Sequence, residues 1–121
     1  MDLQPTLIGA TLTLRPLRED DYAMLYQAAS DPRIWEQHPD SNRYQEEVFK
    51  ERYFRGAINS GGSLVVVENE TGRIVGCSRY YEWSPAKREL SIGYTFIECE
   101  QWGSGTNAEM KQLMLNHAFE S

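Results

Sequence analysis

The sequence predicts an α+β protein whose sheet is largely antiparallel and flanked by helices. Four segments have the residue pattern of strands, and three of these follow one another across turn-like connections. Three other segments have apolar residues at helical spacing. Because sequential strands joined by short turns form an antiparallel meander, the expected order is β-α-α-β-β-β-α, with the helices packed on the sheet.

The composition fits one compact domain that spans residues 1–121. The chain is 40% hydrophobic and 25% charged, which is ordinary for a small globular protein. It has neither the pattern of a signal peptide nor a long apolar run, so we expect a cytoplasmic protein with no membrane partner. The formal net charge of −6 disfavours a nucleic-acid partner and mildly favours a cationic substrate.

The first strand and the first helix follow from local patterns. Thr11 to Arg15 alternates polar and apolar residues, and Pro16 ends the strand because proline has no N–H for the ladder. From Glu19 to Ser30 the apolar residues recur at helical spacing, and the acidic residues that open this segment suit a helix N-terminus. Asp31-Pro32 ends the helix.

A second helix is expected between two breaks in the pattern. Asn42, with Gln45 three residues later, indicates a capping box at its start. Apolar residues then recur at helical spacing until Gly61-Gly62 ends the helix.

The middle of the chain predicts three consecutive strands. Leu64 to Val67 and Ile74 to Trp83 are rich in β-branched and aromatic residues and flank a turn. A second turn leads into Glu89 to Ile97. There we expect one face to consist of alternate residues, namely Leu90, Ile92, Tyr94 and Phe96.

The final segment, Thr106 to Ser121, predicts a helix with an apolar stripe. The cysteines Cys77 and Cys99 are not arranged as a CxxC pair, and reduced thiols are expected. His38 and His117 have no cysteine or histidine at metal-ligand spacing, so no metal site is expected.

A glycine-containing loop joins the Glu89 strand to the last helix. Gly103 and Gly105 permit positive φ and close approach of a ligand, and the following helix directs free N–H groups at the loop. A phosphate group suits such a loop. A simple glycine turn that caps the helix explains the same residues.

Two other phosphate-binding motifs fit less well. A Walker loop requires lysine after its last glycine, where this chain has Thr106. The dinucleotide fingerprint GxGxxG/A is formally matched by Gly103, Gly105 and Ala108, but that motif belongs to the first turn of a parallel βαβ unit. Here it follows an antiparallel meander.

Four short motifs are spread over nearly the whole chain: Leu14-Arg15-Pro16-Leu17 followed by Asp20 or Asp21, Asp31-Pro32, Ile92-Gly93-Tyr94-Thr95, and Trp102-Gly103-Ser104-Gly105 with Glu109. Together they resemble the GNAT superfamily of N-acetyltransferases, particularly the branch that includes ribosomal-protein N-terminal acetyltransferases. The resemblance implies acetyl-CoA as co-substrate, a GNAT-like fold and direct transfer of the acetyl group to a primary amine.

The loop pattern of that superfamily is Gln/Arg-x-x-Gly-x-Gly/Ala, which places Trp102 first, Gly105 at the central glycine and Asn107 last. Trp102 and Asn107 depart from the pattern. The resemblance implies that the pyrophosphate binds backbone N–H groups of the loop and that the pantetheine arm pairs with the strand before it. The expected cofactor-binding residues are therefore Phe96, Ile97, Trp102, Gly103, Ser104, Gly105, Thr106 and Asn107.

A general base is needed because a protonated amine must lose a proton before it attacks. Glu89 is the candidate, since this family often draws an acidic base from the corresponding strand. A solvated charge beside Lys87 and Arg88 is the alternative. Glu98 and Glu100 are expected to form a rim that attracts a cationic substrate. Aromatic clusters at Tyr80, Tyr81 and Trp83, and Trp35 with His38, would line an acceptor pocket or form core.

GNAT folds continue past the helix after this loop, so the resemblance also implies a domain that is incomplete at its C-terminus. The unpaired edge of the Glu89 strand then predicts a homodimer. The leading function is an acetyl-CoA-dependent N-acetyltransferase acting on a small-molecule or peptide amine, namely a protein N-terminus, an amino acid or a small metabolite. The alternative is a catalytically inactive CoA-binding or interaction module.

Overall fold

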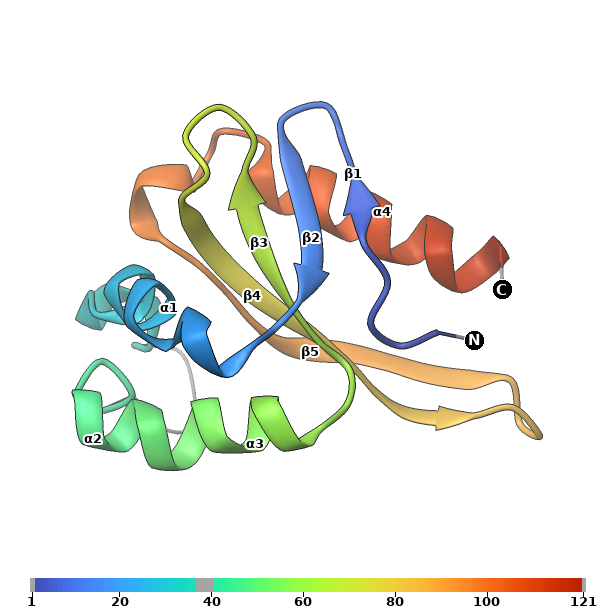
Figure 1. The fold of residues 1–121 in the computed structure, drawn as a ribbon, viewed down its shortest axis with the longest axis horizontal. Helices are drawn as coiled ribbons and strands as arrows, with labels where there is room; N and C mark the ends of the chain where they lie inside the picture. The colour runs from blue at the N-terminus through green and yellow to red at the C-terminus, as the bar shows by residue number, and fades with distance from the viewer. Residues whose placement is uncertain (1, 37–40, 121) are drawn as a thin grey trace.

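An antiparallel sheet of five strands is the framework of the protein (Figure 1). The structure is a computed structural model that describes residues 2–36 and 41–120. Each strand pairs with its neighbours in sequence, which confirms the expected α+β class and the meander. In spatial order the strands are β1 (Leu7–Ile8), β2 (Leu12–Pro16), β3 (Ser63–Glu68), β4 (Ile74–Ser84) and β5 (Glu89–Ile97). The two-residue β1 is too short to give a sequence pattern and was not expected.

Helices cover both faces of the sheet. α1, α2 and α3 lie on one face and α4 lies on the other (Figure 1). Short 3-10 turns occupy Glu19–Asp21, Pro32–Ile34 and Cys99–Gln101, and a π-helical stretch, Lys50–Phe54, joins α2 to α3. The α-helices are α1 (Tyr22–Ala29), α2 (Glu46–Phe49), α3 (Arg55–Asn59) and α4 (Thr106–Glu120).

The expected start of the second helix is wrong. Asn42 lies in a turn, and its carbonyl accepts a hydrogen bond from the backbone N–H of Gln45 at 3.0 Å. Gln45 has extended backbone angles and is itself the N-cap of α2, without a side-chain cap. The pattern Asn-x-x-Gln therefore marks a turn that precedes the helix.

A buried ion pair connects β2 to the turn before α1. Nη1 and Nη2 of the Arg15 guanidinium donate to the Asp21 carboxylate, at 2.9 and 2.8 Å, and the Arg18 backbone N–H donates to it at 2.8 Å. Burial alone would raise the pKa of Asp21, but these hydrogen bonds outweigh it and lower the pKa below its ordinary value. The acidic residue that suggested a helix N-terminus is thus part of a charged link between strand and helix.

The two faces of the sheet bury separate apolar cores. The core under α1, α2 and α3 contains Trp35, Phe49, Tyr53 and Phe96, whose ring centroids lie 5.2 to 6.4 Å apart. Tyr80 belongs to the core under α4. Trp35 and Tyr80 are fully buried, so they are core residues and not pocket walls. His38, the expected neighbour of Trp35, lies outside the described residues.

A β-bulge interrupts β5 at Tyr94. Cys77 pairs with Phe96 and Arg79 pairs with Gly93, so two steps along β4 correspond to three along β5. Tyr94 has a φ of +51°, which is uncommon for a residue with a side chain. An extra residue in one strand disrupts the ladder locally and changes which face the following side chains occupy.

The bulge makes the expected single face of β5 wrong. Leu90 and Ile92 pack against the core on the α4 side, whereas Phe96 is buried on the opposite side. Tyr94 belongs to neither core and is 44% exposed. Because side chains alternate with a period of two, one inserted residue reverses the alternation beyond it.

No helix in the described ranges is long and apolar enough to cross a lipid bilayer. Within residues 2–36 and 41–120, no three histidine, cysteine, aspartate or glutamate side chains are grouped so that they could hold a metal ion. Cys77 and Cys99 are free thiols.

Candidate functional site

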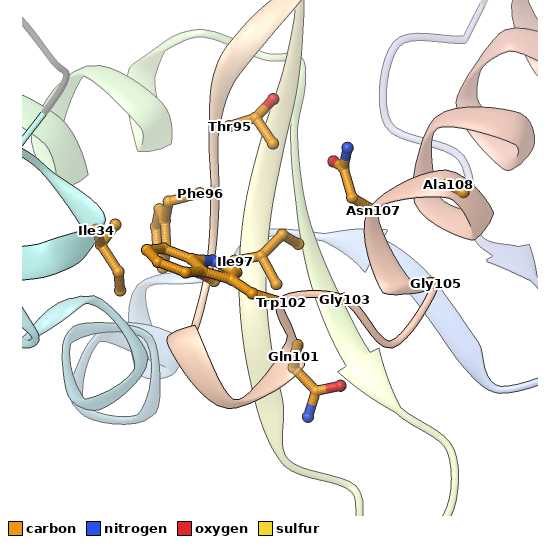
Figure 2. A pocket seen from close by; sticks show the side chains of 10 residues that line it. All are labelled: Ile34, Thr95, Phe96, Ile97, Gln101, Trp102, Gly103, Gly105, Asn107 and Ala108. Atoms are coloured by element: carbon orange, nitrogen blue, oxygen red, sulfur yellow. The ribbon is translucent and has the colours of Figure 1, made fainter.

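A groove of about 580 Å³ lies between the end of β5, the glycine loop and the 3-10 turn after α1. Figure 2 shows the Trp102 indole between Ile34 and Ile97, with Thr95 and Asn107 at the other end. Glycine backbone forms part of the wall, so a ligand can approach the main chain closely. The lining residues are Ile34, Thr95, Phe96, Ile97, Gln101, Trp102, Gly103, Gly105, Asn107 and Ala108.

The glycine loop has the geometry of an anion cradle. Gly103 and Gly105 have φ values of +82° and +89°, and a Cβ at either position would have no other atom within 4 Å. The first turn of α4 follows directly, and the N–H groups of a first turn have no acceptor inside the helix. Together with the positive end of the helix dipole, these N–H groups favour the binding of an anion at this end of the helix. The loop therefore fits a phosphate bound by backbone.

Two of the expected cofactor-binding residues face away from this groove. The Ser104 hydroxyl donates to the Gln101 carbonyl at 2.6 Å and lies 2.9 Å from the Thr106 hydroxyl, which donates to the Gln101 side chain at 3.0 Å. Ser104 and Thr106 line a separate depression beside the β1–β2 turn. The backbone N–H of Ser104 also donates to Gln101, at 3.2 Å. These two side chains stabilise the shape of the loop.

The other six expected residues come together along the free edge of β5. Trp102 is 55% exposed, and its indole N–H donates to the Ile97 carbonyl at 3.1 Å. That carbonyl faces away from β4, and the N–H of the same residue in an extended strand points to the same side. Ile97 thus presents a donor and an acceptor at the groove, and Trp102 covers the acceptor. The six are Phe96, Ile97, Trp102, Gly103, Gly105 and Asn107.

The bulge beside the groove is held by a buried tyrosine. The Tyr53 hydroxyl donates to the backbone carbonyl of Tyr94. Burial raises the pKa of Tyr53 well above its ordinary value and raises that of Cys77 to about 11. Both groups are therefore protonated at neutral pH, and Tyr53 acts as a donor that stabilises the positive φ of Tyr94.

Glu89 lies at the opposite end of β5 from the groove. It is exposed and pairs with Ser84 at the tip of the β4–β5 hairpin, which extends beyond the body of the domain (Figure 1). Thr95 lies six positions further along the strand, which corresponds to about 20 Å. The structure does not bring Glu89 to the groove, and its role as a base stays a prediction that this position disfavours.

The expectation of an acidic rim is wrong for Glu98. Glu98 is only 5% exposed, and its carboxylate accepts hydrogen bonds from the Arg73 guanidinium at 2.5 and 3.3 Å. It therefore neutralises a cation of the β3–β4 turn and is not available to attract substrate. Glu100 is exposed.

Glu109 braces the start of α4 against the N-terminal hairpin. Its carboxylate accepts hydrogen bonds from the backbone N–H groups of Thr11 and Leu12, at 2.9 and 3.0 Å, and from the Thr11 hydroxyl at 2.5 Å. Gly9 makes room for it, since a Cβ there would lie 2.4 Å from the carboxylate. This contact fixes the helix whose first turn borders the groove.

Sequence patterns did not identify four residues of the groove. Ile34 comes from a 3-10 turn far along the chain, and no local signal relates it to β5. Thr95 is brought to the groove by the bulge. Gln101 and Ala108 flank the glycines, and the helix-terminus pattern that identified the loop could have included them.

The chain belongs to the GNAT acetyltransferases. A family model described as an acetyltransferase (GNAT) domain matches residues 11–121, nearly the whole chain. This result confirms the superfamily that the sequence motifs resemble. No curated protein matches the sequence significantly.

Solved structures share the fold. A probable acetyltransferase of the GNAT family from Chromobacterium violaceum superposes with a TM-score of 0.81 at 21% identity, over 97% of this chain and 61% of its own. A GCN5-related N-acetyltransferase from Brucella melitensis gives 0.75 at 15% identity, over 97% and 55%. A candidate ribosomal-protein-serine acetyltransferase from Vibrio cholerae gives 0.67 at 16%, over 99% and 70%. The chain thus spans between 55% and 70% of the length of these three proteins.

Proposed function

We propose that this chain binds acetyl-CoA along the groove beside β5 and transfers the acetyl group to a primary amine. The observation that carries the proposal is that two stretches of backbone border the same groove. These are the glycine loop at the start of α4 and the free edge of β5 at Ile97. The cradle suits the pyrophosphate, and the strand edge suits the amides of the pantetheine arm, as in strand addition. Membership of the GNAT family supports acetyl transfer as the reaction.

The reaction requires no covalent enzyme intermediate. The neutral amine attacks the thioester carbonyl carbon, the new C–N bond forms, and the C–S bond breaks so that the thiolate leaves and takes up the proton that the amine loses. A backbone N–H at the edge of β5 stabilises the charge that develops on the carbonyl oxygen. Cys77 is a protonated, fully buried thiol, so it takes no part as a nucleophile.

The proton of the attacking amine needs an acceptor. Of the described residues that line the groove, none has an ionisable side chain. Solvent in the open groove therefore serves as the route for the proton in this proposal. The same observation favours the alternative of a CoA-binding module without catalysis, and release of free thiol from acetyl-CoA distinguishes the two.

The acceptor is a protein N-terminus, an amino acid or a small metabolite. The motif resemblance to ribosomal-protein acetyltransferases and the similarity to the Vibrio cholerae protein support a protein N-terminus. The formal charge of −6 supports a substrate with a positive charge.

Calorimetric titration with acetyl-CoA tests the backbone cradle. Asp in place of Gly105 would put a carboxylate about 5 Å from a phosphate charge, a repulsion of about 3 kcal/mol at an effective dielectric of 20. We expect Gly105→Asp to weaken binding about 100-fold or more, and Ser104→Ala to change it by less than about threefold, because the Ser104 side chain faces the other way.

A matched control separates electrostatics from backbone strain. Gly72 also has a positive φ, +74°, with open space around it, but lies in the β3–β4 turn. Gly72→Asp carries a similar conformational cost away from the groove. Equal losses of affinity in Gly105→Asp and Gly72→Asp, or in Gly105→Asp and Ser104→Ala, would contradict the cradle.

A further inference from the structure

Arg79 is a buried cation on β4, beside the bulge. The residue is 8% exposed and lies on the face covered by α3. Its Nε donates to the Ser63 hydroxyl at 3.2 Å, and its guanidinium carbon lies 3.8 Å from the centroid of the Tyr94 ring. The ring covers one face of the guanidinium, and the hydroxyl holds one of its five N–H groups.

The charge of Arg79 has no acidic partner in the part of the chain that the structure describes. Other buried charges do have one, as in the pairs Arg15–Asp21 and Arg73–Glu98. For Arg79 the same ranges contain no carboxylate within ion-pair distance and no acceptor for its Nη1 and Nη2 groups. A buried cation without an anion is costly, so its presence indicates a partner that arrives from outside.

A helix and two tyrosine rings surround the guanidinium. A Cβ at Gly56 of α3 would have only Nη2 of Arg79 within 4 Å, at 3.9 Å, so the guanidinium itself lies against this part of the helix. The rings of Tyr81 and Tyr94 meet edge to face at 5.2 Å and form a wall beside it. Two parallel N–H groups of a guanidinium match the two oxygens of a carboxylate.

The position is adjacent to the proposed reaction centre. Arg79 pairs across the sheet with Gly93, the residue before Tyr94, and the two residues after Tyr94 line the groove. Arg79 does not itself line the groove, but the segment that it pairs with continues directly into residues that do. A zwitterion fits both features of the protein, because its ammonium group is drawn to the acidic molecule and its carboxylate to Arg79.

We infer that Arg79 binds the carboxylate of the acceptor, and that the acceptor is an amine that carries a free carboxylate, the chemical class of the amino acids. This inference rests on the proposed acetyl transfer. The carboxylate is bound through both Nη groups and takes no part in the bond changes.

Binding of a matched panel tests the inference without turnover. The 121-residue chain, saturated with CoA, is titrated calorimetrically with free L-amino acids and with the same amino acids as C-terminal amides. We expect at least one acid to bind, and its amide to bind about tenfold more weakly or worse, because a charge-assisted pair is lost. Arg79→Gln should reduce the affinity for the acid to that for the amide. Arg79→Lys should have an affinity for the acid between that of the unsubstituted chain and that of Arg79→Gln.

Arg55→Gln is the control, since it removes an equal charge from the exposed surface of α3, where Arg55 pairs with Glu51 at 3.1 Å. It should leave the preference for acid over amide unchanged. If Arg79→Gln does not fold, the inference is tested by comparing the preference for acid over amide in the unsubstituted chain with that in Arg79→Lys.

Amides that bind as well as acids, or an Arg79→Gln variant that keeps the preference, would overturn the inference. The inference would also be overturned if acetyl-CoA binds but none of the amino acids does. In that case the proposed function would still stand. Failure of acetyl-CoA to bind refutes the proposed function. The preference for acids over amides tests the role of Arg79 independently of that result. A variant that loses thermal stability but keeps its preference would show that Arg79 only supports the Tyr94 ring.

Discussion

Removal of one buried hydroxyl group should separate the stability of the fold from the geometry of the site. Tyr53 and Tyr80 are both buried, and each donates its hydroxyl to a backbone carbonyl, of Tyr94 and Met114 respectively. They lie in the cores on opposite faces of the sheet. Tyr53→Phe and Tyr80→Phe therefore delete the same chemical group at two comparable places, of which only one contacts the bulge.

The expected loss of stability is similar for the two variants. Each variant removes one hydrogen bond between a buried hydroxyl and a backbone carbonyl, which costs about 1 kcal/mol. For a domain of this size, that corresponds to a decrease in Tm of about 3–6 °C for each kcal/mol. Thermal unfolding followed by circular dichroism should show both decreases.

The expected effect on acetyl-CoA binding differs. Without the Tyr53 hydroxyl, the positive φ of Tyr94 loses the contact that holds it, and that conformation costs about 1–2 kcal/mol relative to the right-handed region. Relaxation of the bulge displaces Thr95 and Phe96, which line the groove. We expect Tyr53→Phe to weaken acetyl-CoA binding about tenfold and Tyr80→Phe to leave it within about twofold.

Calorimetric titration at a temperature where both variants are folded is the measurement. Equal affinities of the two variants would show that the bulge is not held by Tyr53 or does not shape the groove. A loss of affinity in Tyr80→Phe as large as that in Tyr53→Phe would show that global destabilisation accounts for the effect.

Three further predictions concern stability and association. Glu109→Gln should lower the free energy of unfolding by about 1–3 kcal/mol, since the amide cannot accept all three hydrogen bonds. Glu120→Gln, on the exposed part of α4, should leave it unchanged, and urea denaturation of the two variants measures the difference. Because the native pKa of Asp21 is lowered, its stabilisation is complete above about pH 4 and is lost as pH falls through the native pKa. Urea midpoints between pH 6 and 2.5 should therefore fall more for the unsubstituted chain than for Asp21→Asn, and parallel curves would contradict this. The unpaired edge of β5 predicts a dimer or larger species, and a clean monomer by light scattering at micromolar concentration would refute it.

Local patterns were sufficient for the elements of the fold. The strands corresponding to β2, β3, β4 and β5 and the last helix were found within a few residues, because a period of two or of 3.6 depends only on neighbouring residues. The glycine loop was also found locally, since positive φ and a helix N-terminus are properties of a short segment.

Contacts between distant segments decided the site. The bulge at Tyr94 exists where β4 and β5 pair with unequal steps, and the alternation of one strand contains no trace of it. The pairing also placed Glu89 at the far tip of a hairpin. Ile34 reaches the groove from another part of the chain.

The sequence by itself therefore determined the class of fold, the meander of the last three strands and the loop that can cradle a phosphate. Only the tertiary structure decided which face each residue of β5 occupies, which donors remain at its edge, and that Arg79 is buried without an acid among the described residues. The physical reason is that backbone conformation responds to local sequence, whereas burial, pairing register and the neutralisation of charge depend on segments that meet only after folding.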